Sequence, residues 1–281
     1  MKKVVLSAML SAVALSANGN VYLTSGVKDY SNSKTKIDGK TNTFGVNYKY
    51  NRNIININIA KDEVNREHFK TKKTLKKLEV EKYNLNYGYK LDDKLSLKTN
   101  YIKIIDNLAP TDQGKVYGIG AKYNFTKGFG TSFDIYKGDY KNFDVNQYDL
   151  ALFKGFIIGD VKSKLTIIAK KIDIDGEKYG NYIFKDKSYF TTGIKLNGMY
   201  DGYVCGVAAF FGKRVFTVLK NGTKVQHHAM EQDKTYMVSF GKKFKNFDLI
   251  ASYSFQNGTE LPEKQNDVDT KVTSLMLKYK F

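Results

Sequence analysis

From about residue 20 onward, apolar and polar residues alternate with a period of two over most of the chain. The last segment is the clearest case, with one face formed by Lys271, Thr273, Leu275, Leu277, Tyr279 and Phe281. The same alternation occurs in residues 44–50, 83–90, 117–125, 190–196, 236–244 and 247–255. A period of two is typical of β-strands with one apolar face. We find no comparable helical pattern in this part of the chain, so the sequence predicts an all-β fold.

The two faces of these strands differ sharply in composition. One face is apolar and aromatic, and the other carries glycine, asparagine, serine and lysine. In a soluble barrel or sandwich the apolar face would point inward, whereas in a transmembrane barrel it points outward to lipid and the polar face lines the lumen. Periodicity fits both arrangements, and the two ends of the chain together with the placement of aromatics favour the second.

The N-terminus has the pattern of a secretory signal peptide. The basic pair Lys2-Lys3 precedes an apolar stretch from Val4 to Ala17, and small residues follow. This stretch is too short to serve easily as a membrane anchor. We expect cleavage between Ala14 and Gly19; the alternative is the first helix of a cytoplasmic domain.

Aromatic residues stand at the strand ends next to short turns or at the C-terminus. They are Tyr50, Tyr89, Phe125, Phe244, Phe247 and Phe281. Such positions are typical of the interfacial girdle of a membrane barrel, although tryptophan, common in such girdles, is absent.

The last strand, closed by Phe281 with Leu275, Leu277 and Tyr279 in phase, resembles that of Gram-negative outer-membrane β-barrel proteins. The resemblance implies a porin-like chain in the outer membrane of a Gram-negative bacterium. It also implies that these four residues are the assembly signal read by the barrel-assembly machinery.

The expected turns give the strand number. Short turns are expected near residues 51–53, 91–94, 126–130, 155–160, 197–202 and 244–247. Longer connections are expected at Ser31–Lys40, Lys61–Lys77, Asp106–Gly114, Asp139–Asp144, Asp173–Ser188, Lys220–Asp233 and Gln256–Asp269. Turn dipeptides mark several tips: Asp38-Gly39, Asp175-Gly176, Asn221-Gly222 and Asn257-Gly258.

Six short turns and seven longer connections predict an antiparallel up-and-down transmembrane β-barrel of about fourteen strands, with twelve as the alternative. We expect residues 1–19 to be the signal peptide and residues 20–281 to form this single domain. No segment remains for a separate plug domain, and we expect the hairpin around Asn221-Gly222 to rise above the membrane on continuous strands.

Composition narrows the function. The chain has 46 Lys and Arg against 28 Asp and Glu, a formal net charge of +18, and a single cysteine. One cysteine excludes a disulfide scaffold, and a hydrophobic content of 42% argues against disorder. Cys205 itself is expected to face lipid as an inert thiol.

The strand phase places many lysines on the polar, lumenal face. They are Lys49, Lys90, Lys98, Lys122, Lys162, Lys164, Lys195, Lys243, Lys278 and Lys280. Few acids share that face, the plain candidates being Asp134, Asp149 and Asp248. Side chains just fill barrels of about eight strands, so a wider barrel holds water. A lysine-rich aqueous lumen favours anions. Alternatively, the lysine excess reflects genome base bias, and loop lysines such as Lys73 contact lipopolysaccharide.

Candidate catalytic or metal-binding residues are few. His68, His227 and His228 all fall in expected exterior loops, so we expect no enzymatic activity and no cofactor. Adjacent side chains usually point apart, which argues against a metal site at the histidine pair. Asp173, Asp175 and Glu177 lack the full spacing of a calcium loop and fit a polar hairpin tip.

The sequence therefore predicts a porin-like channel for passive diffusion of small hydrophilic solutes, with a preference for anions. The main alternative is a non-conducting adhesin or structural barrel, closed by a folded-in loop such as Lys61–Lys77. Two further alternatives are a barrel enzyme and a substrate-selective uptake channel. The expected partners are outer-membrane lipid, lipopolysaccharide and small anions but no nucleic acid, and the expected state is a monomer or small homo-oligomer.

Overall fold

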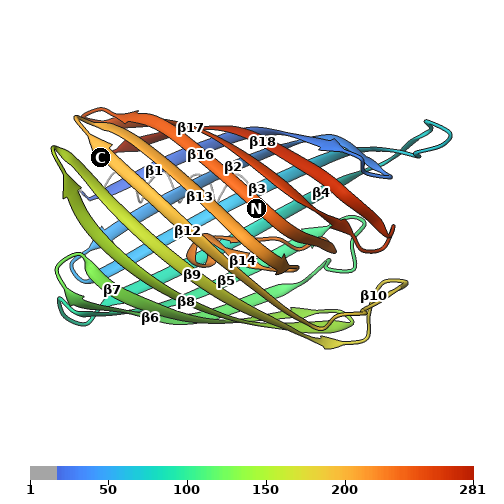
Figure 1. The fold of residues 1–281 in the computed structure, drawn as a ribbon, viewed down its shortest axis with the longest axis horizontal. Helices are drawn as coiled ribbons and strands as arrows, with labels where there is room; N and C mark the ends of the chain where they lie inside the picture. The colour runs from blue at the N-terminus through green and yellow to red at the C-terminus, as the bar shows by residue number, and fades with distance from the viewer. Residues whose placement is uncertain (1–17) are drawn as a thin grey trace, which may run out of the picture.

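The computed structural model describes residues 18–281, and within them fourteen antiparallel strands close into one barrel (Figure 1). The first half of the wall consists of β1 (Gly19–Ser31), β2 (Lys36–Tyr50), β3 (Asn53–Glu67), β4 (Thr74–Lys90), β5 (Leu95–Asp106), β6 (Lys115–Thr126) and β7 (Phe129–Tyr140). The second half consists of β8 (Phe143–Ile158), β9 (Val161–Gly176), β12 (Ser188–Tyr200), β13 (Tyr203–Arg214), β16 (Met230–Lys243), β17 (Phe247–Glu260) and β18 (Gln265–Lys280). The all-β class and the strand number predicted from the sequence are confirmed.

Pairing of the first and last strands closes the barrel, from Asn20 opposite Lys280 to Ser31 opposite Asp269. The backbones of Gly19 and Phe281 exchange two hydrogen bonds of 3.1 Å at this seam. Residues 1–17 of the predicted signal peptide lie outside the described residues.

Two connections contain small elements of their own. The β9–β12 connection holds the hairpin of β10 (Lys178–Tyr179) and β11 (Tyr182–Ile183). The β13–β16 connection holds β14 (Val218–Leu219), the 3-10 helix η1 (Lys220–Gly222) and β15 (Lys224–Val225). In residues 18–281 there is no helix long and apolar enough to cross a membrane.

The outer surface of the barrel is apolar at alternate positions. In β18, for example, Leu275, Leu277 and Tyr279 each expose about half of their surface. Soluble monomers rarely expose such continuous apolar area, whereas a closed barrel in lipid requires it. The strands have 12–17 residues, more than the roughly 9–11 needed to span a bilayer. The chain thus has the fold of a transmembrane barrel, in agreement with the predicted outer-membrane location.

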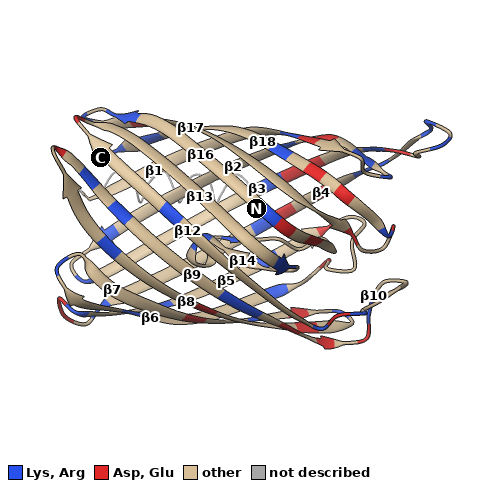
Figure 2. Cartoon of the chain, viewed as in Figure 1, with Lys and Arg blue, Asp and Glu red and all other residues tan. Residues whose placement is uncertain are grey.

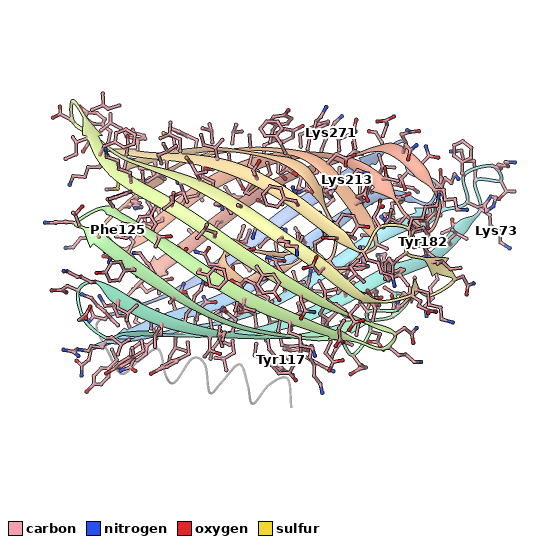
Figure 3. All side chains as sticks on the ribbon, turned by 60° about the horizontal axis from the view of Figure 1, so that its bottom comes forward. Lys73, Tyr117, Phe125, Tyr182, Lys213 and Lys271 are labelled. Carbon is pink, nitrogen blue, oxygen red and sulfur yellow. The ribbon has the colours of Figure 1, made fainter. Side chains whose placement is uncertain are left out.

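The two ends of the barrel differ. Figure 3 shows Phe125 at the end with the short turns, Lys73 at the opposite tip, and Tyr117 on the outer surface between them. Aromatic pairs mark the short-turn end, with ring centroids 5.1 Å apart for Phe125 and Phe129 and 4.3 Å for Phe244 and Phe247. These exposed rings agree with the predicted girdle.

Glycines on the lumenal face make room for aromatic rings that lie against the inner wall. A Cβ atom at Gly130 would lie 2.6 Å from the Phe153 ring, and one at Gly193 would lie 2.3 Å from the Phe210 ring. A strand glycine often marks such a close approach. The glycine-rich face of the sequence therefore reflects packing in the lumen as well as polarity.

Connections are shorter than predicted because strands run past some of the turn dipeptides. Asp38-Gly39 lies inside β2 and Asn257-Gly258 lies inside β17, so the prediction of tips there is wrong. The strand register shifts at both places, between Lys36 and Gly39 and between Gly258 and Glu260. Glycine in a strand favours such bulges. All six short turns do fall where predicted.

A charge on the lipid-facing side of β8 tests the orientation of the wall. Leu150 lies mid-strand and is half exposed, so Leu150→Lys is expected to destabilise the barrel by about 2–4 kcal/mol in lipid. Urea unfolding in vesicles measures this. Ala151→Lys is the control, because the neighbouring Ala151 lines the lumen; an equal loss there would contradict the assignment of faces.

Candidate functional site

Residues 215–229, between β13 and β16, fold into the barrel interior, where Figure 1 shows β14 behind the wall strands. We call them the inward segment. Val215, Phe216, Val218 and Val225 in it are almost fully buried. The predicted hairpin above the membrane is therefore wrong here, because these apolar side chains bury themselves against the inner wall.

Aromatic packing holds the first part of the inward segment. The Phe216 ring lies 4.8 Å from that of Phe143, 5.5 Å from Tyr179 and 6.0 Å from Phe184. The latter two belong to the β9–β12 connection, so two connections and the wall share one aromatic core. This core occupies interior space that the sequence predicted to hold water.

Gln147 of β8 binds the backbone of the inward segment on one wall. Its Oε1 accepts hydrogen bonds from the Val218 N–H at 2.7 Å and the Thr217 hydroxyl at 3.1 Å, and its Nε2 donates to the Val218 carbonyl at 2.9 Å. Lys170 of β9 donates to the same carbonyl at 3.2 Å and pairs with Asp149. A buried amide thus pairs with the segment as a neighbouring strand would.

Asn84 of β4 and Asp106 of β5 bind the inward segment on another part of the wall. The Asn84 amide donates to the Gly222 carbonyl at 2.7 Å. Gly222 has φ +89°, and a Cβ there would lie 2.4 Å from the Asn100 side chain. His227 Nε2 lies 3.2 Å from Asp106 Oδ2. The segment therefore crosses the lumen from β8 and β9 to β4 and β5.

Gln147→Met should loosen the inward segment, because it leaves the buried N–H of Val218 without an acceptor, whereas the Val218 carbonyl keeps its hydrogen bond from Lys170. An unsatisfied buried N–H costs about 1–3 kcal/mol. Hydrogen exchange of residues 215–229 should therefore become faster while the wall strands stay protected. Gln113→Met, at an exposed turn, is the control; unchanged exchange in Gln147→Met would contradict the anchoring role.

A cavity of about 880 Å³ lies between the tip of the inward segment and the short-turn end. We call it the vestibule. Asn221 and Thr223 line its inner side, and Arg52 and Asp92 line it near the turns. Of the lysines predicted to line the pore, those that line the vestibule are Lys49, Lys90, Lys98, Lys122, Lys164 and Lys195. Lys162 and Lys243 are not among its lining residues, and Lys278 and Lys280 lie within 4.0 Å and 2.6 Å of Asp248.

Several vestibule lysines lack an acidic partner. Lys98 pairs with Asp134 at 2.8 Å. In contrast, four lysines make no ion pair within 4.0 Å in residues 18–281: Lys49, Lys122, Lys164 and Lys195. The ammonium groups of Lys122 and Lys164 lie 4.8 and 4.5 Å from the Phe153 ring centroid. The vestibule wall therefore carries excess positive charge.

The other half of the lumen is more nearly balanced. Asp62 pairs with Lys28 at 2.5 Å and with Lys82 at 2.6 Å, and Glu260 pairs with Lys36 at 2.8 Å. Figure 2 shows that the acidic residues, coloured red on the ribbon, lie mainly toward the end with the longer connections. The four vestibule lysines without an acidic partner thus lie in the half of the lumen near the short-turn end.

A chain of hydrogen-bonded asparagine amides follows the lumenal face of β1 to β5. Its members are Asn20, Asn47, Asn56, Asn58, Asn84, Asn86 and Asn100. From the sequence, asparagine is expected only as part of the polar face. The repeated Asn-x-Asn in β3 and β4 was the available signal, because Asn56 pairs with Asn86 and Asn58 with Asn84.

The histidines divide into two groups. His68 is exposed in the β3–β4 connection, as predicted. His227 and His228 are inside the barrel, so their predicted exterior position is wrong, and their rings lie 4.0 Å apart facing Asp106. Burial lowers the pKa of His227 to about 3 and also lowers the pKa of His228. Both imidazoles are therefore neutral at neutral pH.

No protein-family model matches the chain, and no curated protein matches its sequence. Solved structures do match its fold. The CymD monoaromatic hydrocarbon channel aligns with a TM-score of 0.61 at 9% identity, covering 96% of this chain and 90% of that one. A FadL homologue from Pseudomonas aeruginosa gives 0.59 at 10%, covering 96% and 92%. A bacterial polysaccharide outer membrane secretin gives 0.58 at 8%, covering 94% and 99%. This chain therefore has the outer-membrane β-barrel fold.

Proposed function

We propose that the chain is a passive outer-membrane channel that favours small anions, and that its inward segment sets the width of the path. The observation that carries the proposal is the vestibule, a cavity whose lining includes four lysines without acidic partners, namely Lys49, Lys122, Lys164 and Lys195. Excess charge in a narrow water-filled space raises the concentration of counter-ions and repels co-ions. In this proposal no residue acts on a bond.

The similar folds support a channel but leave its cargo open. They include a hydrocarbon channel and a polysaccharide secretin, so one architecture serves different solutes. The residues that line its own lumen therefore determine which solute this chain would pass.

Single-channel recording in a planar bilayer with a salt gradient tests the proposal. We expect small steady currents from the refolded chain, because the inward segment narrows the path, and a reversal potential of anion-selective sign. Cation selectivity would overturn the anion preference. Absence of current from both the wild type and a variant without the inward segment would favour the non-conducting surface barrel.

A second candidate, uptake of a hydrophobic compound, rests on the aromatic core around Phe216. If the inward segment moves, Tyr140, Phe143 and Tyr179 become exposed as an apolar lining inside the barrel. A solved structure of similar fold is a monoaromatic hydrocarbon channel, so a monoaromatic hydrocarbon is the compound to test. Saturable toluene binding to the refolded chain, lost in Phe143→Asp but kept in Phe69→Asp at an exposed loop, would favour it over the anion channel.

Partners outside the lumen belong to the same proposal. The β3–β4 hairpin carries exposed lysines, namely Lys70, Lys72, Lys73, Lys76 and Lys77. We propose that these lysines contact lipopolysaccharide phosphates. We also propose that the barrel-assembly machinery inserts the chain, and that the chain acts as a monomer or small homo-oligomer.

A further inference from the structure

Asp106, His227 and His228 bring three potential metal-ligating atoms together where the inward segment meets β5. Their ligand atoms all lie within 4.8 Å of one another. His227 Nε2 is 3.2 Å and His228 Nε2 is 3.6 Å from the same carboxylate oxygen, Asp106 Oδ2. The expectation that neighbouring histidines point apart is therefore wrong for this pair.

The carboxylate is oriented by the chain that follows it. Asp106 Oδ1 accepts hydrogen bonds from the N–H groups of Leu108 at 2.8 Å and Ala109 at 2.7 Å. These bonds leave Oδ2 directed at the two imidazoles, which is the kind of outer support that fixes ligands in metal sites.

The histidine side of the cluster is incompletely bonded. In the described part of the chain the buried His228 Nε2 makes no hydrogen bond of 3.5 Å or less, and Asp106 Oδ2 lies 3.6 Å from it. Such a buried, unsatisfied ring nitrogen is unfavourable, and a bound cation would satisfy it. The His228 side chain as a whole is 22% exposed, which gives an ion a route to the site.

Two of the three separations between ligand atoms can be compared with tetrahedral coordination. Zinc takes nitrogen and oxygen ligands at about 2.0–2.1 Å in a tetrahedron, which places neighbouring ligand atoms about 3.3 Å apart. The observed 3.2 and 3.6 Å lie close to this separation. We infer that Asp106, His227 and His228 form a binding site for a divalent ion of the zinc class, with a fourth position for water.

An ion at this site would join two parts of the lumen. Asp106 belongs to the wall, whereas both histidines belong to the inward segment. The ion would therefore fasten the segment across the barrel and keep the path narrow. Ion binding is independent of the proposed channel function, whereas its effect on current rests on that function.

Calorimetric titration of Zn²⁺ into the refolded full chain tests the site directly. One ion should bind per barrel, and Co²⁺ in its place should give the visible absorption of tetrahedral coordination. Asp106→Asn should weaken Zn²⁺ binding by about 100-fold or more. Loss of a group that only supports a metal ligand weakens binding by about 10–100-fold. Asparagine keeps an oxygen for the Leu108 and Ala109 N–H groups and loses the ligand oxygen, so folding should persist, as checked by the heat-dependent shift in gel mobility.

His68→Ala is the matched control, because His68 lies in another, exposed connection. It should bind Zn²⁺ like the wild type. Absence of stoichiometric binding, or equal binding by Asp106→Asn, would overturn the metal site and leave a metal-free hydrogen-bonded cluster.

The effect on current separates the two proposals. Zn²⁺ should lower the current of the wild type and not that of Asp106→Asn. Binding without any effect on a measurable current would overturn the fastening role. Absence of current from every variant, with Zn²⁺ binding intact, would overturn the channel and leave the metal site standing.

Discussion

Replacing residues 216–226 by a Gly-Ser turn should raise single-channel conductance severalfold. The replacement removes Phe216 from the aromatic core and takes away the Gly222 tip that reaches Asn84. The lumen would then be continuous from the vestibule to the other end. A turn of about four residues suffices, as in other hairpins, because Arg214 and Gln232 are already paired across β13 and β16.

The control is a turn of the same composition in place of residues 68–73, at the tip of the β3–β4 hairpin. This tip is exposed, so its removal should leave conductance unchanged. Both variants should keep the heat-dependent gel shift of a folded barrel. Equal conductance in the two variants would mean that the inward segment does not narrow the path.

The alternation in the sequence was sufficient to predict the wall. Each strand buries one face against lipid, and a one-residue slip would expose the wrong face, so the period-two pattern persists over most of the wall. In β18 it places Leu275, Leu277 and Tyr279 on the outer surface. The positions of the short turns could also be predicted, because few residues separate the strands there.

The inward segment could not be predicted in the same way. Alternation describes a strand and its two faces, but it does not say whether a connection points outward or into the lumen. That choice is made by Gln147, Asn84 and Asp106, which lie 71 to 138 residues away from their partners in the sequence. The sequence did contain one local indication, because Val215, Phe216, Val218 and Leu219 would be costly to expose in a loop.

The lumenal lysines were only partly predictable. Phase indicates which face a lysine occupies, but its partner depends on strand register. Lys98 reaches Asp134 because the residue between them across the sheet is Gly120, whose missing side chain leaves space: a Cβ there would lie 2.8 Å from the Lys98 Cε. Lys122, Lys164 and Lys195 have aromatic neighbours instead.

Charge reversal of these three lysines should reverse the ion preference of the channel. Lys122→Glu, Lys164→Glu and Lys195→Glu together change the vestibule wall by six charge units, two for each lysine. In a salt gradient the reversal potential should therefore change sign. Replacing the same three residues by Gln should reduce its size without changing its sign, because Lys49 and Arg52 remain in the vestibule lining. The effect should be large at 0.1 M salt, where screening acts over about 10 Å, and small at 1 M, where it acts over about 3 Å.

An equal charge change outside the lumen is the matched control. Glu at Lys70, Lys72 and Lys73 alters the exposed β3–β4 hairpin by the same six units, and it should shift the reversal potential little, because bulk solvent screens these positions. If the hairpin variant shifts the potential as much as the vestibule variant, net charge rather than the vestibule lysines governs selectivity. If neither shifts it, ions take a path that avoids these lysines, and the anion preference has another source.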